Sequence, residues 1–153
     1  MNIKQLSDFL KIAKKNTYAS GKAQKVASTR PKSKDYEHTE GNIVYHDTYF
    51  GANYFIGEEI AYENGEPVWG MNYNGYVLDD NITEAEIDKT LRVALQGESG
   101  DLIPVRGPER FAVEDYEYTN TVTGTLERFE GREEIKKAGR LIYYAIYHGG
   151  LIK

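Results

Sequence analysis

Apolar residues recur at three- to four-residue spacing in two separate stretches of the chain, and each stretch predicts an amphipathic helix. The first stretch predicts a helix over residues 2–15. The second begins at Thr83, which can cap the first turn, and stops before Gly97, so it predicts a helix over residues 83–96. Each helix has one apolar face, and both are therefore expected to pack against a sheet.

Six other segments are rich in aromatic and β-branched residues, which is typical of strands. Along the chain they read GNIVYHDTYFG, FIGEEIAYE, EPVWGMNYN, DYEYTNTV, TLERFEGREEI and RLIYYAIYH. Asn64-Gly65 lies between the second and the third and suits the two positive-φ positions of a type I′ hairpin turn. The strands follow one another with few intervening helices. The predicted fold class is therefore α+β, a bent antiparallel sheet of about six strands with the two helices packed on one face.

Two segments between these elements show no periodicity. Residues 18–35 are small, polar and basic, and they predict a long basic loop; residues 97–108 contain several Gly and Pro and predict an irregular connection. The chain has 153 residues, the length of one ordinary domain. We therefore expect a single domain over residues 1–153, in which a sheet and helix body occupies residues 36–153.

The composition restricts the chemistry and the compartment. Cysteine is absent, which excludes disulfides, thiolate zinc sites and cysteine nucleophiles and fits a reducing compartment. No apolar segment has the length of a signal-peptide core or a membrane span. We expect a cytoplasmic protein that does not enter a membrane.

The net charge of −5 hides an asymmetry along the chain. Residues 1–35 hold nine Lys or Arg and two Asp, a net charge of +7, whereas residues 36–153 have a net charge of −12. A basic segment of this kind either contacts a nucleic acid or lies against the acidic body of its own protein. The acidic balance of the whole chain favours the second interpretation and disfavours a nucleic acid as partner.

Candidate catalytic groups are few. Three histidines are present, and none has the i, i+4 spacing of a helical zinc site, so we predict neither a metal nor another cofactor. Glu59 with His46 or His148 could form an acid–base pair if their strands are adjacent and the side chains share a face. The alternative for each of the three is a strand residue whose polar head is solvated or hydrogen-bonded.

A second set of candidates comes from the aromatic strands. The chain contains thirteen tyrosines, and a Tyr ring buries apolar area while its hydroxyl needs a partner. Trp69, Met71 and Tyr73 share one strand face because strand side chains alternate. We predict that these three residues, with Tyr49 and with Arg30 from the basic loop, bind a small molecule. The alternative is that Trp69 and its neighbours belong to an ordinary core.

Several segments resemble a known family. The series TYA, STRPKSKDYEH, YFGANYFIGEEIAYENGEPVWGMNYNG, RGPE, FEGREEI and YHGGLIK is similar to the DUF5680 family of uncharacterised bacterial domains. Some members of that family are fused to a helix-turn-helix module, and the resemblance therefore implies a sensory or interaction role. It implies no catalytic residues.

Three hypotheses about function follow. The first is a small-molecule-binding or sensory domain that uses the aromatic strands. The second is a small hydrolase or group-transfer enzyme that uses Glu59 with His46 or His148. The third is a module that binds a protein partner through an exposed aromatic face.

Overall fold

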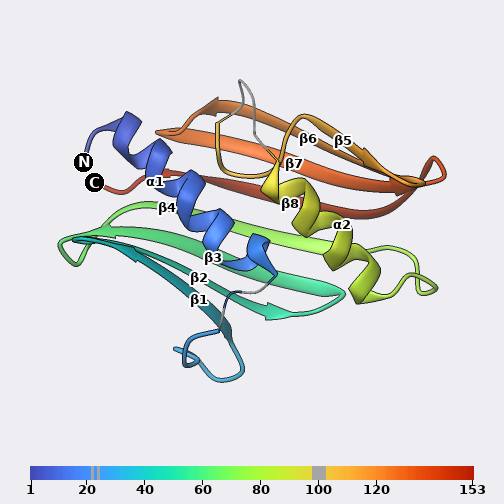
Figure 1. The fold of residues 1–153 in the computed structure, drawn as a ribbon, viewed down its shortest axis with the longest axis horizontal. Coiled ribbons are helices and arrows are strands. Elements are labelled where there is room, and N and C mark those ends of the chain that lie inside the picture. Colours follow the sequence, from blue (N-terminus) through green and yellow to red (C-terminus); the bar gives the residue numbers. More distant parts are fainter. Residues whose placement is uncertain (22, 24, 98–102) are drawn as a thin grey trace.

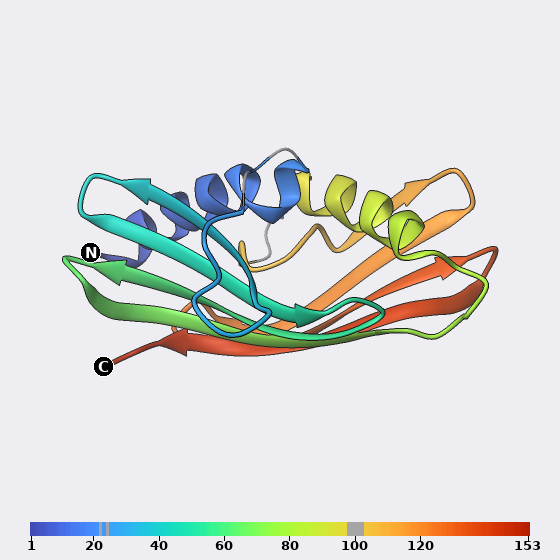
Figure 2. The same ribbon diagram turned by 90° about the horizontal axis from the view of Figure 1, so that it is seen from below.

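The fold is α+β and consists of two α-helices and one open, eight-stranded antiparallel sheet. The computed structural model describes residues 1–21, 23, 25–97 and 103–153. Both helices cover the same face of the sheet, and the sheet bends around them (Figures 1 and 2). We call this the helix-covered face and the opposite one the open face. The fold class predicted from the sequence is confirmed.

The elements follow one another in two similar series, each a helix followed by four strands. The first is α1 (Ile3–Asn16), a short 3-10 helix η1 (Tyr18–Ser20), β1 (Lys34–Glu40), β2 (Ile43–Gly51), β3 (Tyr54–Glu63) and β4 (Glu66–Val77). The second is α2 (Glu84–Gln96), β5 (Arg110–Val113), β6 (Tyr116–Thr125), β7 (Arg128–Lys137) and β8 (Arg140–Leu151).

The two series form two halves related by an approximate two-fold axis. The strand order is β1-β2-β3-β4-β8-β7-β6-β5, so each half is a four-stranded meander and the halves join where β4 pairs with β8. Tyr73 and Tyr147 lie opposite each other in that central pair. The helices run toward each other, and their carboxyl ends meet over the middle of the sheet (Figures 1 and 2).

A repeated motif in the sequence accompanies this symmetry. Phe55, Gly57 and Glu59 on β3 recur 74 positions later as Phe129, Gly131 and Glu133 on β7. Each glycine lies opposite a tyrosine of the next strand, in the pairs Gly57↔Tyr73 and Gly131↔Tyr147. A Cβ added to either glycine would overlap the end of that tyrosine ring. Both halves therefore need a residue without a side chain at this position.

Local sequence signals explain the ends of the helices. The Asn2 side chain caps α1 and Gln5 reaches back to it, while Thr83 and Glu86 form the same capping box on α2. Each box satisfies two backbone N–H groups that the first turn leaves without partners. Asn64 and Gly65 have φ values of 54° and 84°, so the predicted β3–β4 turn is confirmed.

The prediction of about six strands was too low, because the two outermost strands were not recognised. β1 falls partly inside the segment predicted as a basic loop, and β5 has only four residues. Both are edge strands: β1 pairs with β2, and β5 pairs with β6, while Val26 adds one isolated bridge to Asp35 of β1. Edge strands are commonly short and charged, and they consequently lack the apolar alternation by which strands are recognised.

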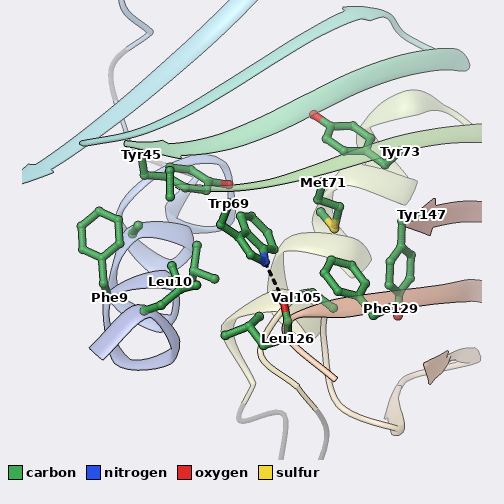
Figure 3. Close-up of a cluster of buried hydrophobic side chains, with 13 residues drawn as sticks. Phe9, Leu10, Tyr45, Trp69, Met71, Tyr73, Val105, Leu126, Phe129 and Tyr147 are labelled. Atoms are coloured by element: carbon green, nitrogen blue, oxygen red, sulfur yellow. Dashed lines mark hydrogen bonds between the residues drawn. The ribbon is translucent and has the colours of Figure 1, made fainter. Parts of the chain in front are cut away.

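The core lies between the helices and the sheet and contains two clusters, one under α1 and one under α2. The cluster under α1 includes Trp69, which is fully buried, and the Trp69 indole N–H donates to the Leu126 carbonyl at 3.1 Å (Figure 3). Phe129 stacks on the indole with ring centroids 5.8 Å apart. No helix within the described residues is long and apolar enough to span a membrane.

Candidate functional site

A cavity of about 80 Å³ lies between the helix-covered face of the first half and the two helices. Its wall is mainly apolar and aromatic, with contributions from α1, η1, α2, the sheet and the segment after α2. The aromatic lining residues are Tyr18, Tyr45, Tyr49, Phe55, Tyr73 and Tyr143. The ionisable lining residues, tyrosines aside, are Lys14, Asp47, Glu59, Glu84, Asp88 and Arg106.

Asp47 and Tyr73 form a buried hydrogen bond at this cavity. The Tyr73 hydroxyl donates to Asp47 Oδ1 at 2.6 Å. The tyrosine reaches from β4 to β2 because Gly57, on the strand between them, leaves room for the ring. Asp47 is only 4 % exposed, so its carboxyl is held largely away from bulk water.

Two buried basic side chains, Lys14 and Arg106, lie beside the neighbouring carboxylates Glu59 and Glu133. Lys14 on α1 forms an ion pair with Glu59, which lies opposite Asp47 in the β2–β3 pair. Arg106 donates from Nε to Glu133 Oε2 at 3.0 Å, and its Nη1 lies 4.0 Å from Glu59 Oε1. Each cation thus has its own carboxylate partner.

Burial and the neighbouring Glu59 carboxylate raise the pKa of Asp47 to about 7, although the Tyr73 hydrogen bond and the positive charges of Lys14 and Arg106 act in the opposite direction. Burial also lowers the pKa of Lys14, and the adjacent Glu59 only partly offsets this effect. Asp47 is therefore expected to keep its proton to a higher pH than a normal aspartate does.

In the second half, Gly107 lies against the side chain that corresponds to Asp47. Asn120 takes the place of Asp47, and its Oδ1 accepts a hydrogen bond from the Tyr147 hydroxyl at 2.6 Å. The Asn120 amide then donates to the Gly107 carbonyl at 2.9 Å, and the Gly107 N–H donates to the Tyr118 hydroxyl. Gly107 is thereby fixed over the second half, while Asp47 in the first half lines a cavity.

The family model for "Domain of unknown function (DUF5680)" matches residues 47–152, which is more than half of the chain. The chain belongs to the DUF5680 family. The family resemblance stated from the sequence is confirmed. The match includes Asp47, Glu59 and Arg106 but not α1, which supplies Lys14. No curated protein and no solved structure gives a significant match to the chain.

Two of the five predicted ligand-binding residues line the cavity of this DUF5680 domain. They are Tyr49 and Tyr73. Trp69 and Met71 share a strand face with Tyr73, as predicted, but they are 0 % and 1 % exposed and belong to the core under α1 (Figure 3). Arg30 forms an ion pair with Glu58, whose side chain alternates with that of Glu59 and lies on the open face.

The three catalytic candidates are not brought together. Glu59 points toward the helices and lines the cavity. His46 alternates with the inward-facing Tyr45 and Asp47, and its Nε2 lies 2.8 Å from Asp35 Oδ1 on the open face. His148 lines a groove on the same open face. Neither histidine therefore shares a face with Glu59.

The residues that the sequence did not single out come from distant segments. Lys14 is one of several lysines in the basic region, and Arg106 lies in a segment predicted only as irregular. The internal repeat was the signal that could have found Asp47. With a shift of 73 positions before the hairpin turn, aligning the two halves places Asp47 against Asn120, and these residues pair with the equivalent Glu59 and Glu133. Among the described residues, no group of three or more His, Asp or Glu is arranged to hold a metal ion.

The open face of the sheet offers a second, shallower surface. A groove there is lined by polar strand residues such as Asn72, Asn74, Thr119 and Thr121. Beside it, Tyr76 packs between Tyr54 and Tyr144, with ring centroids 5.4 and 5.3 Å apart. The hypothesis of a protein partner would use this face and stays a prediction.

Proposed function

We propose that this DUF5680 domain binds a small organic molecule in the cavity of its first half. The observation that carries the proposal is the Asp47 carboxyl, which is buried against the cavity without an ion-pair partner within 4.0 Å among the described residues. A pocket that is mainly apolar and has a few convergent polar groups is the usual form of a small-molecule site.

The unfavourable free energy of burying this carboxyl supports the proposal. Burial of an ionisable group without a counter-charge is unfavourable, and groups with strongly perturbed pKa values are enriched at functional sites. Packing alone does not require a carboxyl here, because Asn120 accepts the same tyrosine hydrogen bond in the second half. Binding of a ligand would explain the carboxyl at position 47, whereas the packing of the fold does not.

The size of the cavity restricts the ligand. A buried water needs roughly 10–15 Å³ of such space, so a cavity of about 80 Å³ accommodates roughly six waters or a molecule with a similar number of heavy atoms. We therefore favour a compact metabolite over a nucleotide or a peptide. A sensory role and a cytoplasmic location remain part of this proposal. We do not extend it to hydrolysis, because the geometry gives no support to a pair of Glu59 with either histidine.

A ligand screen tests the proposal. A panel of small metabolites is added to the protein, and the melting temperature and the tryptophan emission are recorded. Trp69 is the single tryptophan, and its ring lies 5.8 Å from the Lys14 Nζ at the cavity, so a bound ligand is expected to change its emission. A ligand should also raise the melting temperature because it binds the folded state alone.

A blocked variant provides the control. Ala52 lines the cavity from the exposed β2–β3 connection, and Ala52→Phe should obstruct the cavity without disturbing the core. Ala52→Ser is the matched variant that leaves the cavity open. The proposal fails if no compound stabilises the protein, or if Ala52→Phe binds the active compound as well as Ala52→Ser does.

A further inference from the structure

We propose that the ligand of this cavity is a small organic cation, such as a protonated amine, with Asp47 as its counter-ion. This inference rests on the proposed function and specifies the charge of the ligand. It follows from three features of the cavity wall: its aromatic content, its balance of charges and the difference between its two symmetry-related halves.

The aromatic side chains favour a cation. Six of the lining residues are Tyr or Phe, and the faces of such rings attract ammonium groups. The protein already uses these contacts internally. Lys14 Nζ lies 5.7 Å from the centroid of the Tyr45 ring, and the Arg106 guanidinium lies 5.6 Å from that of Tyr73.

The charges of the wall also favour a cation over an anion. Four carboxyl groups line the cavity and only two basic groups do. Lys14 is engaged by Glu59, and Arg106 is engaged by Glu133, so each basic group is already neutralised by a partner. An anionic ligand would have to compete with these buried carboxylates, whereas a cation would meet Asp47.

The comparison with the second half shows that the fold needs a hydrogen-bond acceptor at position 47 but does not need its negative charge. Asn120 has two partners, the Tyr147 hydroxyl and the Gly107 carbonyl, and the second requires an amide donor. Asp47 also accepts a hydrogen bond from a tyrosine, Tyr73, but it lines a cavity at the position where Asn120 contacts Gly107. The raised pKa of Asp47 agrees with a carboxyl whose counter-charge is supplied from outside.

Matched ligand trios test the charge of the ligand. Each trio has nearly constant shape and differs in charge: butylammonium, butanol and butyrate; choline, 3,3-dimethylbutan-1-ol and 3,3-dimethylbutanoate; benzylammonium, benzyl alcohol and benzoate. Affinities are measured by isothermal titration calorimetry at about pH 8, where the Asp47 carboxyl is largely ionised. In at least one trio, the affinity for the cation should be at least about tenfold higher than that for the alcohol, and the carboxylate should bind weakest.

Two variants test whether Asp47 causes the selectivity for a cation. Asp47→Asn should reduce the affinity for the cation to that for the alcohol and leave the alcohol unchanged. Glu66→Gln, exposed at the β3–β4 turn and outside the cavity lining, changes the net charge equally and should leave all affinities unchanged. The inference is overturned if no cation binds, if a carboxylate binds as tightly as its cation, or if Asp47→Asn keeps the selectivity. If instead an alcohol or a carboxylate binds best and Ala52→Phe abolishes that binding, the proposal of a cationic ligand is wrong but the proposed function is upheld.

Discussion

Asp47 and Asn120 occupy equivalent positions in the two halves of the sheet, and each accepts a hydrogen bond of 2.6 Å from a tyrosine hydroxyl of the central strand pair. The two side chains have nearly the same shape and differ in charge and in donor capacity. The second half therefore shows that a neutral side chain satisfies the fold at this position, and the ionisable Asp47 in the first half departs from that requirement.

Exchanging these residues should have opposite effects on stability. Asp47→Asn retains the acceptor for Tyr73 and removes a buried charge, so at about pH 8 we expect it to raise the free energy of unfolding by about 1–3 kcal/mol. Asn120→Asp loses the donor to the Gly107 carbonyl and should lower the free energy of unfolding by about 1–3 kcal/mol. Urea denaturation of both variants measures the two changes.

Each exchange changes the net charge of the protein by one unit, in opposite directions. Glu66→Gln, exposed at the β3–β4 turn, is the charge control for Asp47→Asn, and the exposed Lys153→Met is the charge control for Asn120→Asp. Destabilisation by Asp47→Asn of the same size as that by Asn120→Asp would contradict the interpretation, because it would mean that the fold needs both side chains equally.

The pH dependence of stability provides a separate test of Asp47. Its pKa is 3.8 in the reference state and about 7 in the folded protein, so between these values the folded state holds a proton that the unfolded state has released. The free energy of unfolding should therefore fall as the pH rises from about 4 to 7, by about 2–4 kcal/mol, and then level off. Asp47→Asn should lack this component. Urea titrations of both proteins across this range measure it, and parallel curves would refute the raised pKa.

Local pattern was sufficient for most of the fold. The two helices have regular apolar spacing and recognisable caps, and six strands contain aromatic or β-branched residues between turn signals. The strands that were missed, β1 and β5, are the two edges of the sheet, and each is defined by its pairing with the strand beside it. Pairing of this kind is a tertiary property and leaves little trace in the sequence.

The site was harder to predict for a related reason. Strand alternation places Trp69, Met71 and Tyr73 on one face, but it does not say which part of that face a helix covers. The first two residues lie under α1 and form core, and only Tyr73 reaches the cavity. Lys14 and Arg106 enter from segments far along the chain, and no local spacing relates them to Glu59.

The glycines beneath the central tyrosines provide a test of the internal repeat. In Gly57→Ala, the new Cβ would lie 2.5 Å from Tyr73 Cζ and 2.7 Å from the Thr48 carbonyl oxygen, which belongs to the backbone and cannot easily yield. We expect a loss of more than about 2 kcal/mol in the free energy of unfolding, since overpacking typically costs 1–3 kcal/mol. Gly131→Ala should behave alike, because its Cβ would meet Tyr147 and the Thr121 carbonyl.

Gly41→Ala is the matched control for these two substitutions. It lies in the β1–β2 turn with φ of 60° and has no atom within 4 Å of its added Cβ. Its cost should be limited to the left-handed backbone, about 1 kcal/mol. Equal losses at Gly41 and Gly57, measured by urea denaturation, would show that the tyrosine contact is unimportant.

The ion pair between Lys14 and Glu59 should be asymmetric in its energetics. Lys14→Met leaves a carboxylate that is only 4 % exposed without its lysine, and removal of one partner of a buried pair typically costs about 3–5 kcal/mol. Glu59→Gln should cost less, because burial already lowers the pKa of Lys14 and the lysine can release its proton. The double variant should recover much of the loss of Lys14→Met, because it leaves no unpaired charge. Free energies of unfolding for the four proteins form a double-mutant cycle. Losses that simply add in the double variant would show that Arg106, whose Nη1 is 4.0 Å from Glu59 Oε1, already neutralises this carboxylate.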